Sequence, residues 1–225
     1  MITLALDTST PVASVALRVG ERVLERAEPV TTYSERLLPI VDALFAEAGV
    51  PPQQLAAICC AAGPGSFTGL RIGLSTAKGL CLATGARLAM VPTLAALAVD
   101  APPGATVVCG IDAYRGELYA GLWTLDADGE PRAVRPALAA FATRPEALAA
   151  ALGDARPAFY AGDGFAKYPA AIPAGAVAIA RGDRTVARAV LALGLRALGR
   201  GEDVDPRGAA PLYVRPPAAE EKRGV

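Results

Sequence analysis

Apolar residues occur along the chain in short runs that polar and glycine-containing segments separate. The first run, residues 2–6, ends at the tetrapeptide Asp7-Thr8-Ser9-Thr10, and two further runs cover residues 12–19 and 22–28. Apolar positions in the second run alternate with small or polar ones, which is the period of a half-buried β-strand. The pattern therefore predicts three antiparallel strands joined by tight turns.

A helical period follows this meander and ends at Gly49. Thr32 and Glu35 have the spacing of a capping box at its start. Its apolar stripe is formed by Leu37, Val41, Leu44, Phe45 and Ala48, and Leu38 widens it. After Pro51-Pro52, residues 55–62 form an apolar run that we expect to be a buried strand.

A glycine-rich stretch, Gly63-Pro64-Gly65-Ser66-Phe67-Thr68-Gly69-Leu70-Arg71, joins this strand to a helical run over residues 70–84. Its glycines allow positive φ and expose backbone N–H groups, and the start of a helix favours an anion. Ser66 and Thr68 add hydroxyl donors. A Walker A loop is excluded because Arg71 and Ile72 stand where a Lys-Ser/Thr pair is needed. Two interpretations remain open, a phosphate-binding loop and a tight turn whose glycines serve packing alone.

The helix after this loop is rich in small residues, including Gly73, Thr76, Ala77 and Gly79. Glycine lowers helix stability, so its presence indicates a need for close approach. The neighbour that approaches can be a ligand, the chain's own sheet or another helix. Dense packing against the sheet explains the pattern as well as a partner helix does.

The second half of the chain repeats the order of the first in outline. Asp100-Ala101-Pro102-Pro103-Gly104 is the best boundary, and the strand after it, residues 106–111, ends at Asp112 as the first strand ends at Asp7. Further strands are expected at 117–125, near Ala133 and at 158–161, and helices at 145–152 and 186–198. We therefore predict an α/β protein of two similar lobes, residues 1–100 and 101–225, with a ligand cleft between them.

Composition excludes several classes of protein. The 225 residues are 53% hydrophobic, and 22 basic residues balance 22 acidic ones, so no strong attraction to nucleic acid is expected from net charge. No apolar run approaches the ~20 residues of a membrane span. The first residues lack the basic region and the cleavage site of a signal peptide, which predicts a cytoplasmic protein without membrane attachment.

The chain contains no histidine, which rules out Ser-His-Asp triads, Cys-His dyads and histidine-ligated metal sites. Its four cysteines, Cys59, Cys60, Cys81 and Cys109, have no CxxC spacing and are expected to be small core residues. We therefore predict no stoichiometric transition metal. The turn at residues 7–10 offers a carboxylate and three hydroxyls, which suit a phosphate or its Mg²⁺, but such residues also form ordinary turns.

Five segments together resemble the TsaB (YeaZ) family, in the right order and across nearly the whole chain. They are residues 7–10, the loop at 63–71, Ile111-Asp112-Ala113-Tyr114-Arg115-Gly116-Glu117-Leu118-Tyr119, Gly162-Asp163-Gly164 and Ala210-Pro211-Leu212-Tyr213-Val214-Arg215. The resemblance implies the two-lobed, ribonuclease H-like fold shared by actin, hexokinase and Hsp70. The chain departs from some relatives at Tyr33-Ser34, where those relatives carry a histidine.

The resemblance also implies a function. Members of this family help to form threonylcarbamoyladenosine, a modified base next to the anticodon of certain tRNAs. This subunit is implied to be a non-catalytic scaffold that pairs with a catalytic paralogue, TsaD, and acts with an ATPase, TsaE. It would meet tRNA only through the complex and form a homodimer when alone. No cofactor is expected to bind tightly, although ATP or ADP with Mg²⁺ is a candidate at the partner interface.

Two sets of candidate site residues follow, and no residue is assigned as catalytic or metal-binding. The candidates for contacts with a nucleotide or phosphate are Asp7, Thr8, Ser9, Thr10, Gly63, Gly65, Ser66, Thr68, Gly69 and Asp112. The candidates for the partner interface lie on the two helices: Leu37, Leu38, Val41, Leu44, Phe45, Arg71, Gly73, Thr76, Ala77 and Leu80.

An alternative function is a small-molecule kinase that uses the turn at 7–10 and the glycine loop around Mg-ATP. That activity needs a catalytic carboxylate facing the cleft, for which Asp112 is the candidate, and its adenosine motif would be the short Gly162-Asp163-Gly164. An older label of the family, glycoprotease, is rejected because zinc proteases of that type need histidine ligands.

Overall fold

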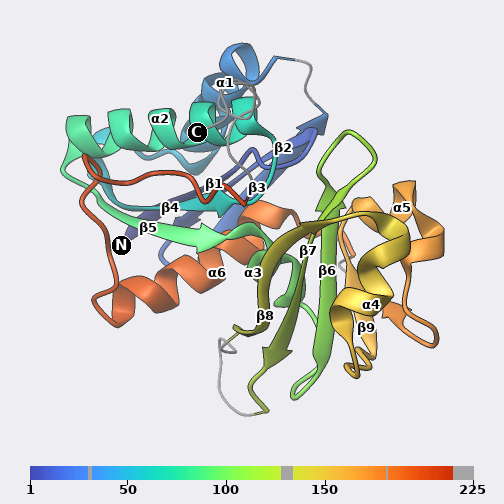
Figure 1. The fold of residues 1–225 in the computed structure, drawn as a ribbon. Helices are drawn as coiled ribbons and strands as arrows, with labels where there is room; N and C mark the ends of the chain where they lie inside the picture. The colour runs from blue at the N-terminus through green and yellow to red at the C-terminus, as the bar shows by residue number, and fades with distance from the viewer. Residues whose placement is uncertain (30–31, 128–133, 181, 215–225) are drawn as a thin grey trace.

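The N-terminal meander and the strand before the glycine loop belong to one mixed sheet (Figure 1). The computed structural model describes residues 1–29, 32–127, 134–180 and 182–214. The sheet has the order β3-β2-β1-β4-β5, and its strands are β1 (Ile2–Asp7), β2 (Val12–Val19), β3 (Arg22–Pro29), β4 (Leu55–Gly63) and β5 (Arg87–Pro92). The β1–β2–β3 pairs are antiparallel, whereas β1–β4 and β4–β5 are parallel. The carboxyl ends of β1 and β4 therefore lie at the same edge.

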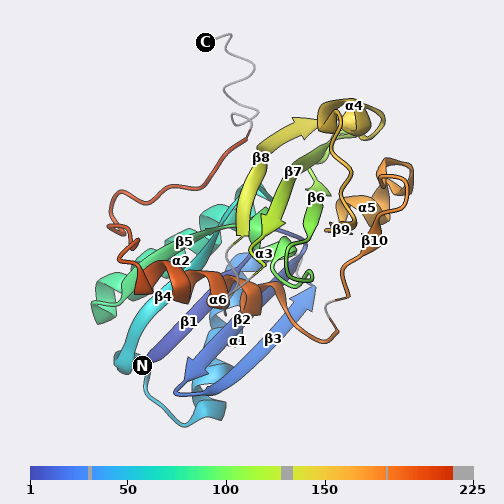
Figure 2. The same cartoon turned by 90° about the horizontal axis from the view of Figure 1, so that it is seen from below.

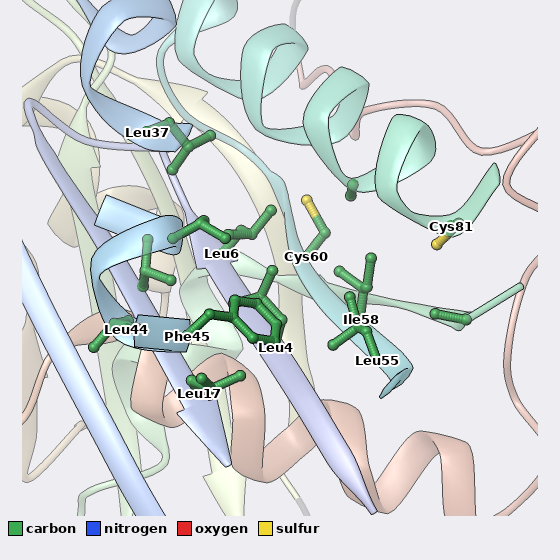
Figure 3. Close-up of a cluster of buried hydrophobic side chains, with 14 of the residues drawn as sticks. Leu4, Leu6, Leu17, Leu37, Leu44, Phe45, Leu55, Ile58, Cys60 and Cys81 are labelled. Carbon is green, nitrogen blue, oxygen red and sulfur yellow. The ribbon is translucent and has the colours of Figure 1, made fainter. Parts of the chain in front are cut away.

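Helices cover both faces of this sheet. On one face lie α1 (Tyr33–Ala48) and α2 (Phe67–Thr84), and between them and the sheet is a cluster of buried side chains that includes Leu4, Leu6, Leu44, Phe45 and Ile58 (Figure 3). The apolar stripe expected on the first helix faces this cluster. The capping box does not form, because the Thr32 side chain makes no capping hydrogen bond and only its backbone carbonyl accepts from Glu35 N, at 3.3 Å.

The other face of the first sheet is covered by α6 (Val186–Gly199), which comes from the far end of the chain (Figure 2). This face is lined by small side chains, namely Ala5, Ala16, Ala57, Cys59, Ala61 and Ala89. Gly194 of α6 sits directly on it, since a Cβ added there would lie 2.3 Å from Cys59 Sγ. The abundance of alanine in the strands therefore lets a helix pack closely against them. Residues from both halves of the sequence thus build the first lobe.

The second lobe repeats the topology of the first. Its sheet has the order β10-β9-β6-β7-β8, with β6 (Thr106–Asp112), β7 (Leu118–Leu125), β8 (Val134–Thr143), β9 (Phe159–Ala161) and β10 (Val177–Ala178). The β6–β7–β8 meander is antiparallel, and β9 lies parallel beside β6 just as β4 lies beside β1. The internal repeat expected from the sequence is therefore confirmed, with β6 in the place of β1.

Shorter elements complete both lobes. The helix α3 (Thr93–Ala98) is buried between the first lobe and the second sheet, while α4 (Leu148–Leu152) and α5 (Gly164–Lys167) lie on the outer side of the second sheet. Single 3-10 turns occur at Pro52–Gln54, Pro145–Ala147 and Pro169–Ala171. The strand start expected near Ala133 lies outside the described residues. Within the described ranges, no helix is both long enough and apolar enough to cross a membrane.

After α6 the chain returns along α2 toward the glycine loop (Figure 1). Val204 N donates to Leu88 O at 2.9 Å, and Leu212 N donates to Ala62 O at 2.7 Å. Residues 212–214 therefore dock at the end of β4. The remaining residues, 215–225, lie outside the described part.

Candidate functional site

Two polar turns meet where β1 and β4 end. Ser66 N, at the start of α2, donates to Ser9 O at 2.7 Å, and Thr8 Oγ1 donates to Gly69 O, also at 2.7 Å. Both turns lie at this edge because β1 and β4 are parallel neighbours. The two turns that were expected to contact a nucleotide are thus joined by direct hydrogen bonds.

The glycines of the loop are needed for this close contact. A Cβ at Gly69 would lie 2.0 Å from Thr8 O, and one at Gly65 would lie 2.4 Å from Ser9 O. Gly63 has φ of +108°, and a Cβ there would lie 2.7 Å from Leu212 O. Packing against the β1 turn and the C-terminal segment therefore explains all three glycines. A phosphate-binding role for the loop stays a prediction.

The carboxylate of Asp7 is fully buried beneath this junction. Its Oδ1 accepts hydrogen bonds from Ser9 N at 3.1 Å and from Ser9 Oγ at 2.6 Å. Thr8 and Ser9 are also buried, whereas Thr10 and Ser66 are half-buried and Thr68 is exposed. The hydroxyls that reach the surface are therefore those of Thr10, Ser66 and Thr68.

The equivalent position of the second lobe carries Asp112, at the end of β6. Its Oδ2 accepts from Lys167 Nζ at 2.6 Å, and its Oδ1 accepts from Tyr114 N at 3.0 Å. Asp163, at the end of the neighbouring strand β9, accepts from Asp112 N at 3.3 Å. Burial raises the pKa of the Asp163 carboxyl, and the charge of Asp112 adds to that rise. This cluster places an ion pair and a second carboxyl at the ends of β6 and β9.

Tyr33 is a site residue that the sequence analysis did not select. Its hydroxyl donates to Thr10 O, and its ring lies against Gly69, where an added Cβ would come within 3.2 Å of Tyr33 Cζ. Burial raises the pKa of the Tyr33 phenol, a hydrogen bond with Ser66 lowers it, and the charges of Tyr114, Asp7 and Asp163 raise it further. Tyr33 therefore stands between polar groups of the two lobes. The sequence signal that could have identified Tyr33 is its position in the chain, because some relatives of the resembled family carry a histidine there.

Lys167 was also missed, because a single lysine on a short helix has no distinctive pattern in the sequence. Its ammonium is 2.6 Å from Asp112 Oδ2 and 5.4 Å from the centroid of the Tyr168 ring. The hydrogen bond from Lys167 to Asp112 raises the pKa of the lysine. The contact bridges 55 residues of sequence, so only the fold reveals it.

The expected partner surface is smaller than the sequence indicated. Six of its ten residues are buried inside the first lobe, where they pack on the sheet or on the β1 turn: Leu37, Val41, Leu44, Phe45, Gly73 and Ala77. Figure 3 shows Leu37, Leu44 and Phe45 in this core. Gly73 faces Thr8, whose Oγ1 would be 2.3 Å from an added Cβ, so this glycine serves packing within the lobe. These six are corrected to core residues. Leu38, Arg71, Thr76 and Leu80 remain accessible at least in part.

A groove of about 250 Å³ runs between α1 and α2 on the outer side of the lobe. Leu38 is 47% exposed beside it. The lining residues include Tyr33, Leu38, Arg71, Ile72, Ser75 and Thr76. Because Tyr33 lines this groove and also bonds Thr10, the groove reaches the polar junction.

The first turn of α2 is tied to the C-terminal segment by an aromatic and guanidinium cluster. The Arg71 guanidinium lies 4.0 Å from the centroid of the Phe67 ring, and Arg71 Nε donates to Tyr213 Oη at 3.0 Å. The rings of Phe67 and Tyr213 are 5.3 Å apart. Together with the bond from Leu212 to Ala62, this cluster holds the chain end against the glycine loop.

Within the described part of the chain, no three acidic, cysteine or histidine side chains are grouped so as to hold a metal ion. All four cysteines are free and buried, as expected. Burial raises the pKa of the Cys59 thiol to about 12 and that of the Cys81 thiol to about 11.

Comparison with known proteins shows which family and which relatives this chain is similar to. The family model of TsaD, tRNA N6-adenosine threonylcarbamoyltransferase, matches residues 29–151. The tRNA threonylcarbamoyladenosine biosynthesis protein TsaB of Haemophilus influenzae is 39% identical over 122 residues, which are 52% of this chain and 51% of that protein. The Bacillus subtilis protein of the same name is 36% identical over 128 residues, 55% of each chain. The chain thus spans about half the length of these curated relatives.

A solved structure matches over a greater length. The crystal structure of an uncharacterized Pseudomonas aeruginosa protein with similarity to peptidase YeaZ is 34% identical, with a TM-score of 0.81. The match covers 95% of this chain and 99% of that one.

Two sheets of matching topology, with polar turns at the ends of β1, β4 and β6, define an α/β protein of the actin-like, ribonuclease H-like class. The fold class expected from the sequence is therefore confirmed. The chain belongs to the TsaB (YeaZ) family. The resemblance that the five sequence segments indicated is confirmed by the same matches.

Proposed function

We propose that this chain is a non-catalytic subunit in the formation of threonylcarbamoyladenosine next to the tRNA anticodon. In this proposal it pairs with a TsaD-like catalytic paralogue and acts with a TsaE-like ATPase. Family membership supports the process, because the matched curated relatives carry that biosynthesis in their names. The observation that carries the pairing is the α1–α2 groove, which leaves Leu38 exposed next to the polar junction.

The groove suits a protein partner better than a small ligand. It is shallow, apolar at Leu38 and Ile72, and bordered by the guanidinium of Arg71 and the hydroxyls of Ser75 and Thr76. An apolar centre with a polar rim is the usual composition of a protein interface. A homodimer of the isolated chain would use the same groove, so partner and second copy would compete for it.

The geometry around Asp112 supports a non-catalytic role. The kinase alternative needs this carboxylate as a proton acceptor, but Lys167 and the backbone of Tyr114 already bind its two oxygens. The glycine loop is likewise engaged, because Ser66 N donates to Ser9 O rather than facing the cleft. The kinase alternative therefore gains no support from the contacts at this site.

A Mg²⁺-bound ATP or ADP is proposed at the partner interface and not in the isolated chain. The groups that would hold it are the hydroxyls of Thr10, Ser66 and Thr68, which reach the surface at the two turns. Bound Mg²⁺ would neutralise phosphate charge beside these hydroxyls. tRNA would bind through the complex, because a chain with zero net charge releases few counterions by itself.

The pairing is tested by the affinity of the chain for a purified TsaD-like partner, measured by calorimetric titration. Leu38→Asp places a charge in the groove and should weaken binding about tenfold or more, because a carboxylate is costly to desolvate. Val177→Asp is the matched control, since Val177 is 60% exposed on the second lobe. Equal affinities of wild type and Leu38→Asp, with unchanged melting temperatures, would contradict the assignment of the groove.

A further inference from the structure

A second cavity lies between the two lobes on the α6 side of the molecule. Its volume is about 360 Å³. The first lobe contributes Met90 of β5 and Leu193 of α6, while the second contributes Trp123 of β7 and Val134 of β8. Because α6 and the α1–α2 pair cover opposite faces of the first sheet, this cavity is separate from the groove proposed for the partner.

The inner wall of the cavity is apolar and aromatic. Met90, Pro92, Val134 and Leu193 surround Trp123, which is only 6% exposed. The indole N–H of Trp123 has no hydrogen-bond acceptor among the described residues. Ligand pockets begin at about 300 Å³ and are mostly apolar with a few polar groups, so the space suits a small molecule with an aromatic ring system.

The rim of the cavity is charged. Arg196 and Arg200 extend from the last turns of α6, and Glu202 follows them. Arg200 Nη2 lies 2.8 Å from Glu202 Oε2, and both side chains are about half exposed. A guanidinium has five N–H donors, so Arg200 keeps donors for a second acceptor while it binds Glu202. Because Glu202 already places one negative charge at the rim, we expect the ligand to carry only a single negative charge.

We propose that this cavity binds a small aromatic monoanion, such as an aromatic carboxylate or sulfonate. The ring system would pack between Trp123 and Met90, and the acidic group would accept hydrogen bonds from Arg196 and Arg200. Since both lobes line the cavity, such a ligand bridges them. Binding therefore raises the melting temperature with ligand concentration, because only the folded chain presents the site.

The test is a titration of the full chain with anilinonaphthalene sulfonate, an aromatic monoanion that fluoresces in apolar surroundings. Trp123 is the only tryptophan, so its emission reports on this wall. We expect saturable binding of one probe per chain with a change in Trp123 emission. Ala197→Phe, which fills the cavity from α6, should abolish that binding, and Arg200→Gln should weaken it about tenfold.

Two control variants separate the effect of an added ring from the effect of a lost positive charge. Ala83→Phe adds the same ring to the exposed side of α2, and Arg156→Gln removes an exposed arginine of the second lobe that bonds only backbone carbonyls in its own turn. Both should bind the probe as wild type does. Neutral phenylnaphthylamine should bind about tenfold more weakly than the sulfonate, because it cannot accept from the arginines.

The outcomes decide the proposal in either direction. If Ala197→Phe unfolds, Arg200→Gln alone decides, because its side chain is exposed and its loss leaves the core intact. Absence of saturable binding, or equal binding by wild type and Arg200→Gln, would overturn the site. Equal affinity for the neutral probe would overturn the assignment of an anion.

Discussion

Replacing Gly69 by alanine tests whether the glycine loop is shaped by packing within the chain. A Cβ at this position would lie 2.0 Å from the backbone carbonyl of Thr8, well inside the 3.4 Å at which ordinary contact begins. A carbonyl oxygen cannot rotate away as a side chain can. Either the β1 turn or the start of α2 must therefore move.

The expected cost combines three contributions. Overpacking costs roughly 1–3 kcal/mol, and disturbing the hydrogen bonds from Thr8 to Gly69 and from Ser66 to Ser9 costs about 0.5–1.5 kcal/mol each. Alanine returns up to ~1 kcal/mol of helix propensity. We expect a net destabilisation of about 2–4 kcal/mol, which corresponds to a fall in melting temperature of roughly 5–15 °C for a chain of this size.

Gly79→Ala in the same helix is the matched control. No atom lies within 4 Å of a Cβ added at Gly79, so this variant should gain about 0.5–1 kcal/mol from helix propensity alone. Both variants are compared with wild type by thermal denaturation followed by circular dichroism. If Gly69→Ala melts at or above the temperature of wild type, packing does not explain the glycine, and a role in ligand binding becomes the better interpretation.

Three further predictions concern titration and reactivity. Burial raises the pKa of Asp163, so the folded state loses stability as the pH rises from the unfolded value of 3.8 through the raised folded value. Asp163→Asn should therefore melt above wild type at pH 7, and thermal scans near pH 3.8 should show no advantage. Burial raises the pKa of Tyr33 above 10.0, so an ultraviolet titration should show a late ionisation phase, and Tyr33→Phe should remove that phase. A thiol reagent at pH 8 should label none of the four buried cysteines in the native chain and all four in urea, and rapid native labelling would contradict their burial.

Much of the fold could be predicted because its signals are local. Alternation in residues 12–19 and the turn at Gly20-Glu21 depend on neighbouring residues only, and they indicated the meander that the structure contains. The repeated order of strand, aspartate and meander likewise indicated two lobes of one topology.

The facing directions of small residues could not be predicted in the same way. Gly69 and Gly73 approach Thr8, and the bond from Thr8 to Gly69 spans 61 residues of sequence. A glycine contributes no hydrophobic side chain, so the helical period does not reveal whether it faces the sheet or a partner. The sequence pattern was therefore compatible with an interface at Gly73 that the structure instead fills with the β1 turn.

The polar site depended even more on distant contacts. Tyr33 and Lys167 reach the site only because α1 and α5 carry them to strand ends elsewhere in the fold. The return of α6 to the first sheet is a further case, since its own sequence predicts a helix and not the sheet that it covers. The helices and strands could be predicted from the local sequence, whereas tertiary packing decides which of them lie next to each other.

We propose above all that this chain supports threonylcarbamoyladenosine formation through the α1–α2 groove. The most direct measurement is the threonylcarbamoyladenosine content of tRNA, by mass spectrometry of digested nucleosides, in bacteria depleted of their own TsaB protein and supplied with this chain. Wild type and Val177→Asp should restore the modified base, and Leu38→Asp, expressed at the same level, should not. Failure of the folded wild type to restore it, or full restoration by Leu38→Asp, would contradict the account.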